Sequence, residues 1–205
     1  MGFFERNRDQ LAEAGIDPRR LPPGQYHTDR FPVLHAGSVP RYNDLSKWTF
    51  SIGGLVDAPA TLTWNDIQAL PAIEVSVDIH CVTKWSKFDT KWKGVPFSSV
   101  YEMARVRETA THIMCHCEFG FTANLPIEDV LGDNIALLAY QYDGKPLEPD
   151  HGYPLRFFVP KLYFWKSAKW LRGIEFMAGD KPGFWEQNGY HMYGDPWREQ
   201  RYWDD

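Results

Sequence analysis

Hydrophobic and polar residues alternate in several short stretches of the chain, and the longer period of a helix is rarer. Apolar side chains recur at every second position over residues 48–52 and again over residues 75–79. Such alternation predicts half-buried strands. Apolar runs over residues 135–140 and 171–177 predict two further strands that are buried.

The helical signals are short and end at breakers. Thr63 is a predicted N-cap, and Pro71 closes the pattern that follows it. The other predicted helices cover residues 6–14, 98–107 and 126–131, the last entered from a turn over residues 120–125. Short helices mixed with strands, without regular βαβ alternation, predict an α+β fold with mixed β-sheets.

The length and the aromatic content predict one domain with a well-filled interior. A chain of 205 residues commonly forms a single domain, here residues 1–205. Residues 1–20 are polar and are predicted to be peripheral, whereas residues 180–205 are too aromatic for a disordered tail and are predicted to pack on the domain. Nine Trp, ten Tyr and thirteen Phe can line a pocket for a planar ligand or simply fill a core.

Charge and cysteine usage narrow the classes of partner and location. A net charge of −5 argues against a nucleic-acid-binding surface, which needs an excess of Lys and Arg. Three cysteines form no disulfide framework, and Cys115 and Cys117 share one face of a predicted strand, which indicates core packing. The chain has no signal-peptide pattern and no apolar run of membrane-spanning length, so a cytoplasmic location is expected.

Candidate chemistry begins at Cys81, which follows the alternating stretch 75–79 where a strand gives way to a predicted loop. His80, Lys84 and Lys87 lie close to it in sequence, and positive charge favours the thiolate, the nucleophilic and metal-binding form of cysteine. A single cysteine is more often a buried and inert core residue, so this stretch alone does not establish a site.

A second stretch places cationic side chains among aromatic residues. His151 and Arg156 precede Lys166 and Lys169, with a run of Phe, Tyr and Trp between them. Such a group of donors suits an anionic ligand, whereas each basic residue taken alone is more often a solvated surface charge.

At these two stretches the chain resembles the molybdopterin-binding domain of the sulfite oxidase family, in particular its small single-domain prokaryotic members. The resemblance rests on His-Cys-Val-Thr-x-Trp-Ser at residues 80–86, on His-Gly-x-Pro-x-Arg at 151–156, and on Lys-Ser-x-Lys-Trp at 166–170. It covers roughly residues 45–178, and the two separated, ordered motifs make it specific.

The resemblance implies a cofactor and assigns residues to it. Molybdenum would be held by molybdopterin and by Cys81, which would be both the metal ligand and the catalytic residue. The residues that would contact the cofactor are His151, Arg156, Lys166, Ser167, Lys169, Thr83 and, from an extended N-terminal segment, His35. Of these, the basic residues and Ser167 would surround the pterin and its phosphate.

The reaction implied is two-electron oxygen-atom transfer on a small sulfur- or nitrogen-containing substrate, with electrons exchanged with an external carrier. Sulfite oxidases place an Arg five residues after the metal cysteine, and here Ser86 stands at that position. Reduction of an S-oxide, as in relatives that reduce methionine sulfoxide, is therefore a competing hypothesis, as is a positive charge supplied instead by Lys84, Lys87, His80 or His116.

Two other classes of function remain open from the residues alone. One is a cofactor-free thiol enzyme with Cys81 as nucleophile and a histidine such as His80 as base. The other is a non-catalytic binding domain that uses its aromatic side chains.

Overall fold

Two β-sheets make up the framework of the chain in the computed structural model, which describes residues 2–132 and 135–205. The strands are β1 (Tyr26–His27), β2 (Thr49–Gly54), β3 (Ala60–Thr63), β4 (Ile73–His80), β5 (Trp85–Pro96), β6 (His112–Cys117), β7 (Thr122–Pro126), β8 (Leu137–Tyr142), β9 (Lys145–Pro146), β10 (Arg156–Phe158) and β11 (Leu171–Met177). One sheet has the order β1-β5-β8-β10, with β4 paired to β5 and β9 to β8, and the other has the order β3-β2-β11-β6-β7.

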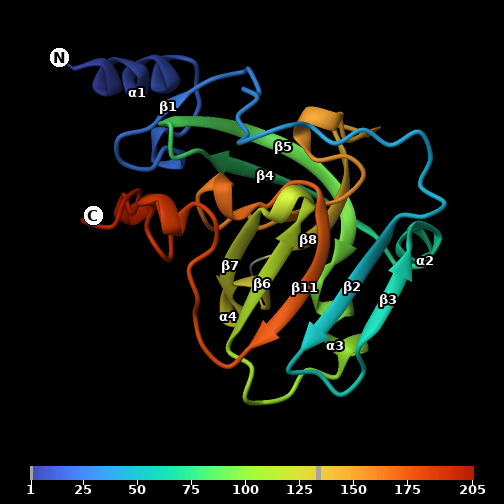
Figure 1. Cartoon of the computed structure of the whole chain (residues 1–205). Helices are drawn as coiled ribbons and strands as arrows, with labels where there is room; N and C mark the ends of the chain where they lie inside the picture. The colour runs from blue at the N-terminus through green and yellow to red at the C-terminus, as the bar shows by residue number, and fades with distance from the viewer. Residues whose placement is uncertain (1, 133–134) are drawn as a thin grey trace.

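Both sheets are mixed. Strand β1 runs parallel to β5 and β2 runs parallel to β11, whereas the other pairs, such as β4 with β5 and β6 with β7, are antiparallel. Figure 1 shows the second sheet from β7 to β3 across the lower half of the molecule. The predicted α+β class with mixed sheets is confirmed.

The α-helices of the described residues are short. They are α1 (Phe3–Glu13), α2 (Trp64–Ala69), α3 (Phe97–Ala104) and α4 (Ile127–Val130). Helix α2 has its predicted cap, because Thr63 Oγ1 accepts the Asp66 N–H at 3.2 Å and the Asp66 carboxylate accepts the Thr63 N–H at 2.8 Å. Helix α3 ends earlier than predicted because Arg105 adopts a left-handed φ of 49°. Within residues 2–132 and 135–205, no helix is long and apolar enough to cross a membrane.

Two stretches that were predicted to be irregular are strands. The residues after Cys81 form β5, in which buried Phe88, Thr90 and Trp92 alternate with more exposed polar residues. This is a strand pattern, and the sequence prediction differs from it because the lysines of this stretch also suit a charged loop next to a site. Residues 120–125, predicted as a turn, contain most of β7, whose pairing with β6 supplies hydrogen bonds that a local pattern does not reveal.

The core consists of a main cluster and a second cluster around Cys81. The main cluster joins both sheets to α3, with Phe97 and Phe157 completely buried. The second cluster contains Cys81 and a stacked pair, Trp92 and Phe158, with ring centroids 4.4 Å apart. Because large aromatic side chains bury much apolar area, the turn at Cys81 rests on a tightly packed base.

The N-terminal residues form a small unit that is fastened to the larger sheet. Leu11, Leu21 and Phe88 make a separate cluster. The Arg20 guanidinium donates to both carboxylate oxygens of Asp78, at 2.9 and 2.6 Å. Figure 1 shows α1 at the outer edge of the molecule, with the C-terminal residues on the same side.

Candidate functional site

A cavity of about 230 Å³ lies next to the second cluster. It gathers residues from the turn after β4, the segment before β2, the stretch 151–170 and the C-terminal segment. Among its lining residues are seven of the eight predicted from sequence: His35, Cys81, Thr83, His151, Arg156, Ser167 and Lys169. Residues 116 positions apart in the chain, His35 and His151, thus border one space.

Cys81 follows directly on β4 and begins a tight turn into β5. Its N–H donates to the Trp85 carbonyl at 2.8 Å, and its own carbonyl accepts the Lys84 N–H at 2.9 Å. Lys84 takes a left-handed φ of 74° to close this turn. The Cys81 Sγ lies 3.2 Å from Thr83 Oγ1, and the residue is only 6% exposed. The turn holds the thiol at the wall of the cavity.

The protein matrix does not favour the Cys81 thiolate by itself. Burial raises the pKa of the thiol, and hydrogen bonds from Thr83 and the backbone offset this only in part. His80, Lys84 and Lys87 are not among the groups that lower the pKa of this thiol, whereas the charge of Lys169 is. A bound metal ion is the charge that deprotonates a coordinating thiol, so the buried sulfur is suited to metal ligation.

The other charges predicted to stand near the substrate lie elsewhere. Burial lowers the pKa of His80 to about 4, and its ring bonds the Ser86 hydroxyl at 2.8 Å. The Lys84 ammonium lies over an aromatic ring of α1, and Lys87 donates to a backbone carbonyl. His116 pairs with a surface glutamate. None of the four lines the cavity.

A buried polar network supports the cysteine turn from behind. Gln25 Nε2 donates to the Cys81 carbonyl at 3.1 Å, and the Ser86 hydroxyl donates to Gln25 Oε1 at 3.4 Å. Gln25 and Ser86 are completely buried. The residue at the position of the sulfite oxidase arginine therefore belongs to the support of the turn and does not line the cavity.

Arg156 brings a buried cation to the cavity. It is 1% exposed, and its guanidinium donates to the carbonyls of His151 at 2.9 Å and Ser167 at 2.5 Å. It lies 4.3 Å from the centroid of the Phe164 ring. Burial lowers its pKa to about 9, and its Nε has no hydrogen-bond partner. No carboxylate of the described residues pairs with this cation.

Lys169 and His151 complete the polar end of the cavity. The Lys169 ammonium donates to the carbonyls of Leu34 and Asp150 at 2.8 and 2.7 Å, and burial, with the charge of Arg156, lowers its pKa to about 7. The His151 ring stacks on an aromatic ring, with the two ring centroids 3.9 Å apart, and burial lowers the pKa of His151 to about 4. A neutral imidazole, a guanidinium and an ammonium group whose pKa is lowered thus line the same space.

The remaining predicted residues have lesser roles in this geometry. Ser167 uses its hydroxyl to accept the Val159 N–H at 3.0 Å, and its carbonyl holds Arg156. His35 is exposed, bonds the Gly37 carbonyl at 3.1 Å and lies at the rim of the cavity.

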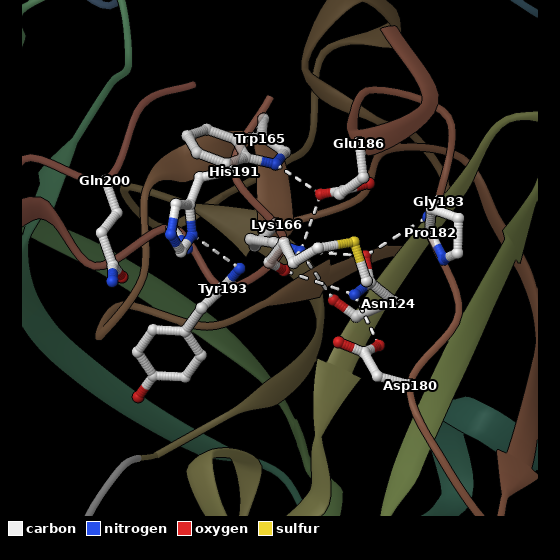
Figure 2. Close-up of polar contacts among 12 residues, drawn as sticks. Asn124, Trp165, Lys166, Asp180, Pro182, Gly183, Glu186, His191, Tyr193 and Gln200 are labelled. Atoms are coloured by element: carbon white, nitrogen blue, oxygen red, sulfur yellow. Dashed lines mark hydrogen bonds and ion pairs between the residues drawn. The ribbon is translucent and has the colours of Figure 1, made fainter. Parts of the chain in front are cut away.

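Lys166 does not reach the cavity, so its predicted contact with the phosphate does not fit this structure. Its ammonium is completely buried and lies 2.7 Å from Glu186 Oε1. It also donates to the side-chain and backbone oxygens of Asn124, at 2.9 and 3.1 Å, and to the Met192 carbonyl at 2.6 Å. Figure 2 shows Glu186 and Asn124 around Lys166. The motif does not reveal this difference, because Phe164 and Trp165 of the turn 164–166 line the cavity and Lys166, the next residue, does not.

The sequence prediction missed three aromatic residues that form one wall of the cavity: Trp165, Trp185 and Tyr190. We call these three residues the aromatic wall. Two of them come from the C-terminal segment. Its Trp and Tyr content indicated that the segment packs on the domain but did not identify the surface that it covers. Burial raises the pKa of Tyr190, so its hydroxyl keeps its proton at neutral pH.

The residues of the cavity fit an anionic planar group that carries a metal. The Arg156 guanidinium is buried with an unpartnered Nε, and the buried indole N–H of Trp85, which also lines the cavity, has no partner either. Arginine and lysine bind phosphate by charge-assisted hydrogen bonds, and a cysteine sulfur suits a metal already bound by sulfur. Molybdopterin is a group of this kind.

Comparisons with known proteins agree with this chemistry. The model of the family "Oxidoreductase molybdopterin binding domain" matches residues 36–185. The oxidoreductase YuiH of Bacillus subtilis (strain 168) is 53% identical over 186 residues, which cover 90% of this chain and 93% of YuiH. Sulfite oxidase of Arabidopsis thaliana is 27% identical over 199 residues, which cover 80% of this chain and 51% of that protein.

A solved structure also shares the fold. The crystal structure of the sulfane dehydrogenase SoxCD from Paracoccus pantotrophus matches with a TM-score of 0.63 and 21% identity, over 71% of this chain and 41% of that chain. The family match spans most of the sequence, and the relative from Bacillus subtilis aligns over nearly its full length. This chain therefore belongs to the family of oxidoreductase molybdopterin-binding domains and is a sulfite oxidase-type enzyme whose cofactor is molybdenum held by molybdopterin.

Proposed function

We propose that the chain reduces a small neutral S-oxide or N-oxide by oxygen-atom transfer. The observation that carries the proposal is the distribution of charge in the cavity. Among its described lining residues, Arg156 and Lys169 are the cations, and both fit the pterin phosphate. The aromatic wall is uncharged, and Ser86 is buried behind the turn. A neutral substrate needs no further cation, whereas sulfite does.

The residues of the chain would divide the work as follows. Cys81 would ligate the molybdenum, with Thr83 beside the sulfur. Arg156, Lys169 and His151 would hold the phosphate and the pterin. When bound, the cofactor supplies the two-electron oxygen-atom transfer. Tyr190 keeps its proton and would donate a hydrogen bond to the oxygen of the substrate.

The reaction requires an electron donor from outside the chain. Reduction of an S-oxide consumes two electrons and two protons and releases the sulfide and water. An external one-electron or two-electron carrier would supply the electrons, and the three free cysteines are compatible with a cytoplasmic enzyme. The metal site, the carrier and this location are parts of the proposal.

Oxidation of sulfite is the second candidate, because Lys169 lines the same cavity as Cys81 and its charge lowers the pKa of the Cys81 thiol. Turnover of dimethyl sulfoxide with reduced methyl viologen, compared with turnover of sulfite with ferricyanide, separates the two directions. We expect the first activity and expect Cys81→Ser to abolish it. Faster turnover of sulfite would favour the second candidate, and no turnover of either by molybdenum-loaded protein would refute both.

A further inference from the structure

A buried ion pair lies directly behind the aromatic wall. The side chains of Lys166 and Glu186 are both 0% exposed, and Figure 2 shows the Glu186 carboxylate next to the Lys166 ammonium. Burial lowers the pKa of Lys166, and the charge of Glu186 opposes this. A buried pair is weak evidence for stability, because well-packed apolar residues often serve as well. Its placement is therefore the better guide to its role.

Glu186 is connected to each member of the aromatic wall. Its Oε1, which faces Lys166, also accepts the indole N–H of Trp165 at 2.8 Å (Figure 2). Its backbone belongs to the turn 186–188, between the other two members of the wall, and the Tyr190 N–H closes this turn by donating to the Trp185 carbonyl at 3.1 Å. Glu186 thus links the ring of one wall residue, through its carboxylate, to the turn that presents the other two, through its backbone.

The rings of the wall pack as one unit. The centroid of Tyr190 lies 5.1 Å from that of Trp165 and 4.9 Å from that of Trp185. A Cβ placed on Gly194 would lie 2.8 Å from the Trp165 ring, so the C-terminal segment leaves this ring little room to move. A displacement of one ring is therefore transmitted to the next.

We propose that Glu186, anchored by Lys166, is a positioning residue that fixes the aromatic wall and thereby sets the size of the substrate that the cavity accepts. The part of this proposal that concerns substrate size rests on the proposed function, whereas the part that concerns the placement of the wall does not. Lys166 acts through this anchor and not through a contact with the cofactor.

Glu186→Gln tests the proposal with little change in shape. The amide leaves the buried Lys166 without an anionic partner, and it places an NH₂ group where Glu186 Oε2 has no hydrogen-bond partner. The matched control is Asp129→Asn, because Asp129 is 3% exposed and pairs with Lys161 but does not line the cavity. Both variants remove one buried carboxylate charge from a lysine pair.

The first readout is independent of activity. Protein labelled with 5-fluorotryptophan gives ¹⁹F NMR resonances, and those of Trp165 and Trp185 are assigned from the single Trp→Phe variants. We expect Glu186→Gln to shift or broaden both resonances and Asp129→Asn to leave both in place. Unmoved resonances in folded Glu186→Gln would overturn the proposal. If that variant does not fold, Lys166→Met combined with Glu186→Gln removes the lone buried charge, and the same shifts are expected.

The second readout is the ratio of kcat/KM for methyl phenyl sulfoxide to that for dimethyl sulfoxide. We expect Glu186→Gln to change this ratio by about tenfold, mainly through KM, because small displacements of positioning groups have effects of this order. The molybdenum content should not change, and Asp129→Asn should keep the ratio. An unchanged ratio in Glu186→Gln would overturn the proposal. If the wild type reduces neither sulfoxide, the proposed function fails, while the NMR experiment still decides the role of Glu186.

Discussion

Replacement of Arg156 by methionine should separate the stability of the fold from retention of the cofactor. Without a bound anion, burial of the charged guanidinium costs free energy in the folded chain, and its hydrogen bonds offset this cost. Lowering its pKa to about 9 corresponds to a cost of roughly 5 kcal/mol for the charged form, at about 1.4 kcal/mol for each tenfold change in proton affinity. Its two hydrogen bonds to carbonyls return about 1.5–3 kcal/mol each. The two effects nearly cancel.

Arg156→Met should therefore leave the free energy of unfolding of the cofactor-free protein within roughly 2 kcal/mol of the wild type. The cofactor should bind far more weakly, because loss of one partner from a buried charged pair costs about 2–5 kcal/mol. Urea unfolding measures the first quantity in protein from a host that does not make the cofactor. Molybdenum content, in protein from a host that does, measures the second.

Arg172→Met is the control for this experiment. Arg172 pairs with Glu118 at 2.9 Å, is about one third exposed and does not line the cavity, so its loss should leave the molybdenum content unchanged. Retention of wild-type molybdenum content by Arg156→Met would refute the reasoning. A loss of more than about 4 kcal/mol in the cofactor-free variant would refute the energetic part of it.

Three further predictions concern the support of the site. The free energy of unfolding of cofactor-free protein should rise between about pH 7 and pH 10, because folded Lys169 loses a proton that the unfolded chain keeps. Urea unfolding as a function of pH measures this rise, and Lys169→Met should remove it. Gly94→Ala places a Cβ 2.2 Å from the Leu138 carbonyl oxygen, which should cost roughly 3 kcal/mol and lower the Tm by about 6–12 °C. Gly53→Ala is the control and should leave the Tm unchanged, because a Cβ added there has no neighbouring atom within 4 Å. Gln25→Leu removes the donor to the carbonyl of the metal cysteine and should cost about 1–3 kcal/mol in urea unfolding, and an unchanged midpoint would show that the network does not support the turn.

Local sequence patterns identified the strands that carry a clear alternation or an apolar run. Strands β2, β4 and β11 lie where the pattern predicts them, and α2 has the cap that Thr63 predicts. Strand β7 could not be identified in this way, because its partner β6 supplies the pairing that defines it. Local periodicity reports burial on one element and does not report which element lies opposite.

The candidate site shows the same limit. The two motifs identified six residues that the fold brings to one cavity, and the extended N-terminal segment supplied a seventh, His35, although the lining comes from distant parts of the chain. They did not distinguish Lys169, which faces the cavity, from Lys166, which is buried against Glu186. The aromatic wall was missed because the path of the C-terminal segment depends on contacts such as the hydrogen bond from Trp165 to Glu186.

The most direct test of the account is the molybdenum content of the wild type and of Cys81→Ser, measured by inductively coupled plasma mass spectrometry on protein from a host that makes the cofactor. X-ray absorption at the molybdenum edge then counts the sulfur ligands. We predict about one molybdenum per wild-type chain, and one sulfur ligand fewer on the metal that Cys81→Ser retains. Folded wild type without molybdenum, or an unchanged sulfur count in Cys81→Ser, would contradict the assignment of Cys81 as the metal ligand.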